Sequence, residues 1–231
     1  MSSLDSEQSS YDDRPLVDDL LEKHAKAITS VRESILADDE CKDLYAKGDN
    51  TTRYDDIWIL RYVLTHKGSA KYASKAAIST IKFRDKVGIN KLGDIRHRLK
   101  QHGNPDSEAM ANIEPLPGYE LFNKYCGENA VSLTLPDKNR GLIMYCAVGA
   151  IDQHGIAENI DENTLKDLMM YGNEAMFQVV DEITRRTGRL TKMTKILDMG
   201  NASLRGINRT YIKRDAVCSK ALEDNYPQLL A

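Results

Sequence analysis

Side chains that commonly carry catalysis are present in this chain, but their spacing matches none of the common catalytic motifs. The five histidines are scattered, and the closest two are five residues apart, so they do not share one face of a helix. The sequence contains neither a phosphate-binding glycine loop nor the Gly-x-Ser-x-Gly motif of many hydrolases. It therefore predicts no catalytic residues, no metal site and no cofactor, and it favours a protein that is not an enzyme.

Basic residues gather at two places, where they could attract an anion. The two clusters are Arg96, Arg98 and Lys100, and Arg185, Arg186, Arg189 and Lys192. The simpler interpretation of each cluster is a solvated helix end, where the helix dipole favours cations, and the alternative is attraction to anionic lipid headgroups. Over the whole chain the 32 basic and 35 acidic residues nearly balance, which predicts no nucleic-acid partner.

Three further features indicate the compartment. Residues 1–13 are rich in Ser and Asp and lack the basic and apolar regions of a secretory signal, so we expect a disordered tail there. The four cysteines are widely spaced, which favours a reducing environment. The longest uncharged stretch, Gly141–Ile151, is too short to span a bilayer. We therefore expect a soluble, cytoplasmic protein.

The first hundred residues have the apolar spacing of helices. Between Pro15 and Tyr45, apolar residues recur every three or four positions, which predicts one helix or a pair of helices. Asp55 is a helix-capping residue before a second apolar stripe, and a third stripe ends near Gly88. We therefore predict a helical lobe over residues 14–103, followed by a connection.

After the connection, the apolar pattern changes to that of strands alternating with helices. In order, we predict strands over 131–135 and 142–148, a helix from Asp161 to Gly188, a strand over 193–199 and a helix over 207–224. A helix that joins two strands of one sheet usually covers a face of that sheet in a right-handed crossover. Residues 118–231 are therefore predicted to form an α/β lobe with a mixed or parallel sheet.

Three parts of the chain carry a resemblance to a known family. The first comprises Asp55–Leu64 and Phe83–Lys86, the second is Asp137–Gly141 before an apolar strand, and the third combines Lys195–Met199 with Leu222–Pro227. Together they resemble the motifs of the CRAL-TRIO lipid-transfer family. This family includes phosphatidylinositol and phosphatidylcholine transfer proteins and the cellular retinaldehyde-binding and alpha-tocopherol transfer proteins. The third part is the most specific, and the resemblance spans Pro15 to Ala231.

This resemblance implies a fold, a function and partners. The family's domain joins a helical N-terminal lobe to an α/β lobe that encloses a hydrophobic cavity. It continues beyond the position of Ala231, so we expect the chain to be truncated C-terminally. The implied function is binding of a hydrophobic lipid (phospholipid, phosphoinositide or isoprenoid-like) and its transfer between membranes or its presentation. The implied partners are the lipid and, transiently, a membrane surface, which makes the protein peripheral to membranes and leaves its oligomeric state open.

The resemblance also points to residues that would contact a lipid headgroup or the membrane. In relatives that transfer phosphatidylinositol, an Arg-Lys pair and a Glu after Tyr-Pro belong to the headgroup site. The matching positions here are His66, Lys67 and Gln228. An amide can hydrogen-bond an inositol hydroxyl, but it lacks the strength of a charged carboxylate, so phosphatidylinositol recognition is expected to be altered.

Candidate lipid-binding residues lie in the predicted α/β lobe. They are Met144, Tyr145, Met169, Tyr171, Met176, Met193, Lys195 and Leu197. Strand alternation places Lys195 on one face with Met193 and Leu197, where it is either a surface lysine or a cation that faces an anionic lipid group. The resemblance aligns Tyr171 with a tyrosine that relatives use for choline headgroups, and a cation at Lys195 would repel such a headgroup. Each of these residues is also compatible with an ordinary core or surface position.

Two other functional interpretations remain. The altered headgroup positions are compatible with a protein-interaction or regulatory module of the same fold that carries no lipid. A hydrolase-like enzyme fits less well, because the sequence has no nucleophile motif. A lipid that copurifies with the protein would favour a lipid carrier over the interaction module. Ester turnover that is abolished by one substitution would favour the enzyme.

Overall fold

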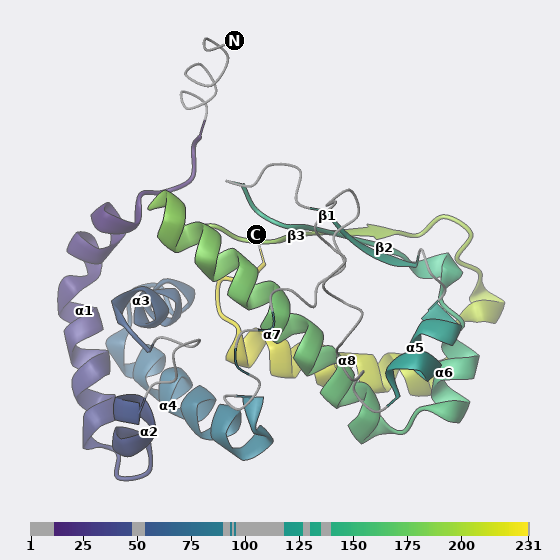
Figure 1. Ribbon diagram of the computed structural model, residues 1–231, viewed down its shortest axis with the longest axis horizontal. Coiled ribbons are helices and arrows are strands. Elements are labelled where there is room, and N and C mark those ends of the chain that lie inside the picture. The colour runs from purple at the N-terminus through teal and green to yellow at the C-terminus, as the bar shows by residue number, and fades with distance from the viewer. Residues whose placement is uncertain are drawn as a thin grey trace.

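The computed structural model of the chain describes residues 12–47, 54–89, 93, 95, 118–126, 130–134 and 140–230. Figure 1 shows the four helices of the first half on one side and a small sheet with the helices of the second half on the other. The long helix α7 (Glu162–Thr187) runs between these two groups. The protein is therefore mixed α/β, as the order of its predicted elements indicates.

The helical half contains α1 (Val17–Ala37), α2 (Cys41–Lys47), α3 (Asp56–Thr65) and α4 (Ala70–Val87). The first predicted segment is thus a pair of helices, α1 and α2. Local signals set two of the helix ends. The Asp55 side chain accepts a hydrogen bond from the N–H of Trp58 at 3.1 Å, and Gly88 ends α4 with a φ of 73°. Both capping predictions are confirmed.

The sheet contains β1 (Val131–Thr134), β2 (Ile143–Ala147) and β3 (Thr194–Asp198), in that order. β1 and β2, which match the first two predicted strands, pair antiparallel, whereas β2 and β3 pair parallel. The sheet is therefore mixed. The connection from β2 to β3 includes α7, whose predicted ends are confirmed: the Asp161 side chain caps its first turn, and Gly188 follows its last turn with a φ of 64°.

The second half also contains helices that the apolar pattern did not predict. They are α5 (Tyr119–Cys126) and α6 (Gln153–Asn159), with two short 3-10 turns, Val148–Ala150 and Leu204–Gly206. The predicted last helix is α8 (Arg209–Asn225). α5 and α6 are too short to be stable by propensity alone, so they depend on packing against α7 and α8.

Two separate hydrophobic clusters form the core of the described residues. The first joins the helical half to the start of the sheet and includes Trp58, Leu142, Phe177 and Met193. The second lies under α5 and α6 and includes Cys126, Ile156, Ile160 and Leu165. Both clusters use α7, at different points along its length. The interior of the second half is therefore divided, and α7 spans the division.

Several predictions fall wholly or partly outside the described residues. They concern the first eleven residues of the tail, most of the lobe connection, residues 137–139 of the motif Asp137–Gly141 and the basic cluster at 96–100. Asp12, which the sequence places in the tail, is described and pairs with Arg14 at 2.5 Å. Among the helices that the structure describes, none is long and apolar enough to cross a bilayer.

Candidate functional site

A glycine interrupts the buried face of α7. Leu165, Leu168, Met176 and Val179 lie along one face of this helix and are buried. Gly172 occupies the centre of the same face, and none of the described residues has an atom within 4 Å of the position that a Cβ would take there. Among the residues that the structure describes, the apolar face of α7 therefore borders an open space at Gly172.

The open space coincides with the division in the core. On one side of Gly172, Met176 packs in the first hydrophobic cluster with Met144 and Met193. On the other side, Leu165 belongs to the second cluster. Met170 belongs to the first cluster and Met169 packs against the second, so among the described residues the two clusters meet on α7 close to Gly172. Sequence reasoning missed this glycine, although a glycine inside an apolar helical stripe was a detectable signal.

The face of the sheet that meets α7 is only partly covered. On the parallel pair, Met144 lies opposite Lys195 and Cys146 lies opposite Leu197, so these four side chains share one face with Met193. Met193 is 2% exposed, but Leu197 is 53% exposed and Lys195 is exposed as well. Met193, directly before β3, is therefore covered, whereas residues 194–197 of β3 are exposed.

The opposite face of the sheet carries Tyr145, whose hydroxyl donates a hydrogen bond to Asp198. This bond raises the pKa of Tyr145 and lowers that of Asp198. Ile196, on the same face, is 45% exposed. Beyond Met193, both faces of β3 therefore reach solvent, and strand alternation does not separate a buried face from an exposed one. Tyr145 therefore lies on the face of the sheet opposite to Met144, which packs against the first hydrophobic cluster.

Lys195 supplies a positive charge on the helix-facing side of the sheet. Burial raises the pKa of Asp215 on α8, and the charge of Lys195 opposes part of that rise. Burial likewise raises the pKa of Cys146, with Lys195 again acting in the opposite direction. Lys195 is therefore close enough to Asp215 and Cys146 to influence their ionisation, while its own side chain remains exposed.

The three candidate residues of α7 fall in different surroundings. Met169 packs against the second hydrophobic cluster, and Met176 is buried in the first. Tyr171, which lies between these two methionines in the sequence, is half-buried. The structure thus places Met169 and Met176 on either side of Gly172, where they flank the open space rather than forming one continuous wall.

The three candidate headgroup residues come together at the end of α3. The Gln228 side chain donates a hydrogen bond to the Thr65 hydroxyl at 3.0 Å. His66 and Lys67 directly follow Thr65, and both Lys67 and Gln228 adopt a positive φ, 53° and 59°. The segment after α8 and the end of α3 therefore form one corner of the molecule, although they are far apart in the sequence.

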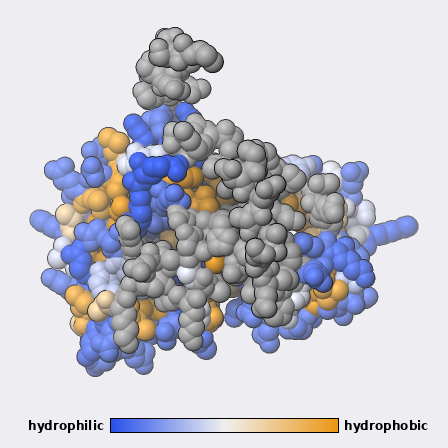
Figure 2. Space-filling view, in the orientation of Figure 1, coloured by the Kyte–Doolittle hydropathy of each residue, from blue (hydrophilic) through white to orange (hydrophobic). Residues whose placement is uncertain are grey.

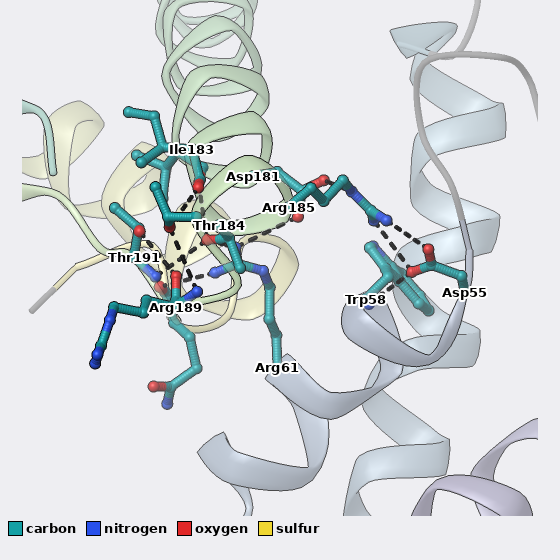
Figure 3. A network of polar contacts seen from close by, with 12 residues as sticks. Asp55, Trp58, Arg61, Asp181, Ile183, Thr184, Arg185, Arg189 and Thr191 are labelled. Carbon is teal, nitrogen blue, oxygen red and sulfur yellow. Dashed lines mark hydrogen bonds and ion pairs between the residues drawn. The ribbon is translucent and has the colours of Figure 1, made fainter. Parts of the chain in front are cut away.

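A buried arginine joins α3 to α7 (Figure 3). Arg61 is fully buried and donates hydrogen bonds to Asp181 at 3.3 Å and to the Thr184 hydroxyl at 3.1 Å. Its guanidinium also lies 5.4 Å from the centre of the Phe177 ring. Burial lowers the pKa of Arg61, and the charge of Asp181 opposes this effect. The network fixes the helical half against the long helix.

Arg185 extends this network to the start of α3. Its side chain donates to Asp181 at 2.6 Å and to Asp55, the residue that caps α3, at 2.5 Å. Arg189 donates to the backbone carbonyl of Arg14 at 2.6 Å. Two members of the second basic cluster are therefore engaged in contacts between segments, and the interpretation of that cluster as a solvated helix end is wrong for them.

The carboxyl end of α8 also docks on the helical half. The Tyr62 hydroxyl donates to the carbonyl of Asn225, and the Thr80 hydroxyl donates to the carbonyl of Asp224, each at 3.4 Å. Arg61 donates to the carbonyl of Gln228 at the same distance. The contacts of Tyr62 and Thr80 satisfy carbonyl groups that the end of a helix leaves without partners.

Comparison with known proteins gives no further assignment, so the site is interpreted from its own geometry. No protein-family model matches the sequence, and no curated protein matches it significantly.

Proposed function

We propose that this protein binds one hydrophobic lipid in the space beside Gly172 and transfers it between membranes or presents it. The single observation that carries the proposal is the open space at the centre of the apolar face of α7. A glycine inside a helix costs about 1 kcal/mol relative to alanine. Its presence at this position is explained if part of a ligand occupies the volume that a side chain would otherwise fill.

The chemistry around Gly172 supports an apolar ligand. Leu168 and Met176 flank the glycine on α7, and Met144 and Met193 line the adjoining face of the sheet. Methionine side chains adapt to irregular apolar shapes, and apolar cavities remain dry and accept apolar molecules. An acyl or isoprenoid chain fits this description better than a polar metabolite does.

The open end of β3 supports an entrance for the headgroup side of such a lipid. Leu197 faces the helices but is 53% exposed, so this end of β3 is accessible to solvent. Lys195 on the same face supplies a positive charge that would attract an anionic headgroup and repel a cationic one. We therefore favour a lipid with net negative charge.

The energetics of such binding need no cofactor or chemical step. Burial of an alkyl chain in an apolar cavity recovers about 0.8 kcal/mol per methylene, which is comparable with its environment in a bilayer. Exchange between protein and membrane can then proceed by thermal motion, and the protein acts as a carrier without catalysing a reaction.

We further propose that the fold is of the CRAL-TRIO type. Support comes from the contacts between the segments that carry the resemblance. The end of α8, within the motif over Leu222–Pro227, accepts a hydrogen bond from Tyr62 of α3, and Gln228 beyond it donates one to Thr65. Motifs that are distant in the sequence thus meet at one interface.

Native mass spectrometry of the purified protein tests the proposal, with lipid extraction and identification from the same sample. We expect one lipid per chain under gentle ionisation, released when the protein is denatured. A protein that is free of lipid after expression, and that also fails to take up fluorescent anionic phospholipid from vesicles, would contradict the proposal.

One observation favours the alternative of a protein-interaction module. Ile196, Leu197 and Met199 are all exposed at or just after an edge strand, and β3 has no second partner among the described residues beyond the bridge of Met193 to Leu230. Edge strands with exposed apolar residues are common pairing sites for other chains. A lipid-free protein that captures a β-strand peptide would support this alternative.

A further inference from the structure

An acid-free stretch of sequence runs through α3 and into α4. No Asp or Glu occurs from Ile57 to Arg84, whereas this stretch contains seven basic or histidine residues. Three of them, Arg61, Lys82 and Arg84, pair with acidic side chains from other segments. The remaining basic residues therefore lie in a part of the chain that has no acidic residue of its own to pair with.

The unpaired cations share one exposed surface. Lys71 and Lys75 are one turn apart on α4, and Lys67 lies in the preceding turn between α3 and α4. All three lysines are exposed, and none forms an ion pair within the part of the chain that the structure describes. Each positive charge is therefore available to an external partner.

An aromatic ring projects from the same surface. Tyr72 is 60% exposed, and its ring lies 6.5 Å from the ring of His66. The ring of a second histidine, His24 of α1, is 3.9 Å from the position that a Cβ on Gly68 would take. We name Lys67, Lys71, Tyr72 and Lys75 the α4 docking face.

We propose that the α4 docking face binds the surface of an anionic lipid bilayer. This inference rests on the proposed lipid-carrier function, because a carrier must contact a membrane to exchange its ligand. An exposed tyrosine among lysines is suited to the boundary between headgroups and acyl chains, where the ring is buried while the hydroxyl and the ammonium groups stay hydrated. A nucleic acid would use the charges but offers no such boundary, and the net charge of −3 gives no wider positive field.

The docking face adjoins the corner that holds the candidate headgroup residues. Lys67 belongs to both, and Thr65, which precedes it by two residues, accepts the hydrogen bond from Gln228. Binding of the bilayer at this face would bring that corner of the molecule next to the lipid headgroups.

Cosedimentation of the full chain with vesicles tests the inference. We expect binding to phosphatidylcholine vesicles that contain phosphatidylserine, weaker binding as the salt concentration rises, and little binding to phosphatidylcholine alone. The variant Lys67→Asn/Lys71→Gln/Lys75→Gln should lower the partition coefficient about a hundredfold, since each lysine contributes about fivefold. Asn suits position 67 because it tolerates a positive φ.

A matched control removes the same charge elsewhere. Lys86→Gln/Arg209→Gln/Lys213→Gln neutralises three exposed cations outside the docking face. It should bind the vesicles like the unmodified chain. An equal loss of binding in both triple variants, or equal binding of the unmodified chain to neutral and anionic vesicles, would overturn the inference.

Fluorescence distinguishes a bilayer from a polyanion. The single tryptophan, Trp58, is 3% exposed, so Tyr72→Trp adds a solvent-exposed reporter at the docking face. We expect its emission to shift to shorter wavelength with anionic vesicles and not with duplex DNA. Binding to DNA that is tighter than binding to vesicles, without such a shift, would replace the membrane by a nucleic acid.

The two proposals can fail separately. Copurified lipid together with no vesicle binding would overturn the docking face and leave the lipid-carrier function standing. Vesicle binding through the docking face, with no lipid held or taken up by the protein, would overturn the carrier function alone.

Discussion

Arg84 of α4 and Glu174 of α7 form a buried bidentate ion pair, with distances of 2.7 and 2.9 Å between guanidinium nitrogens and carboxylate oxygens. Both side chains are at most 2% exposed. Burial alone would lower the pKa of Arg84, but the charge and hydrogen bonds of Glu174 outweigh burial and raise it. Gln178 donates a further hydrogen bond to the same carboxylate at 3.0 Å. This cluster links the helical half to the helix that borders the proposed lipid space.

Removal of one member of this pair should destabilise the folded protein much more than replacement of both members. Glu174→Ala leaves an uncompensated buried guanidinium and should lower the free energy of unfolding by about 3–5 kcal/mol. Arg84→Met/Glu174→Leu removes both charges and keeps the volume apolar, so it should lose far less stability. Urea denaturation of the three proteins measures the difference. A double variant as unstable as Glu174→Ala would show that the pair is not the source of the loss.

Substitutions of Gly172 should separate stability from lipid binding. Gly172→Ala should raise the free energy of unfolding by about 1 kcal/mol, because the position is helical and has room for a methyl group. Gly172→Phe should fill the space and abolish lipid binding while the chain stays folded. Thermal unfolding and native mass spectrometry measure the two effects.

Gly141→Ala is the matched control for these variants. A Cβ at Gly141 would lie 2.1 Å from the backbone carbonyl oxygen of Lys192, so this substitution should destabilise the protein. If Gly172→Phe still carried lipid at full occupancy, the lipid would have to bind elsewhere.

The N-terminal ion pair should contribute stability only above acidic pH. The hydrogen bond from Arg14 holds the pKa of Asp12 at about 2, below its ordinary value of 3.8. Because the folded state lowers this pKa, the contribution is complete well above 3.8 and disappears as the pH falls towards 2. Asp12→Asn should therefore be less stable than the unmodified protein at neutral pH, and the difference should vanish near pH 2.

Melting temperatures measured across this pH range test the prediction. Asp13→Asn is the control, because it changes the same charge at the neighbouring exposed position and keeps the pair of Asp12 with Arg14. A constant difference between Asp12→Asn and the unmodified protein at all pH values would contradict the assignment.

The four cysteines should resist alkylation in the folded protein. All four are buried and free, and burial raises the pKa of Cys126 to about 12 and that of Cys41 to about 11. The thiolate is the reactive form, so iodoacetamide at neutral pH should modify none of them until the chain is unfolded. Mass spectrometry counts the adducts with and without urea. Rapid labelling of Cys146 alone would instead indicate that the space between sheet and helices opens in solution.

Local sequence signals determined the ends and the order of the main elements. Asp55 and Asp161 cap helices because a carboxylate satisfies backbone N–H groups of the first turn, and Gly88 and Gly188 end helices because glycine readily adopts a positive φ. The change in apolar pattern after the connection was likewise sufficient to predict β1, β2 and β3. These features depend on interactions between residues that are close in the sequence, so they can be predicted from the sequence alone.

Contacts between distant segments were decided only by the tertiary structure. The sequence did not predict the short helices α5 and α6, which depend on packing, or the pairing of Arg84 with Glu174. It aligned Gln228 with the headgroup site but did not place it against Thr65. The open space beside Gly172 also depends on where two hydrophobic clusters end. The physical reason is that a residue's own type fixes its local preference, whereas its burial and partners depend on which remote surfaces pack against it.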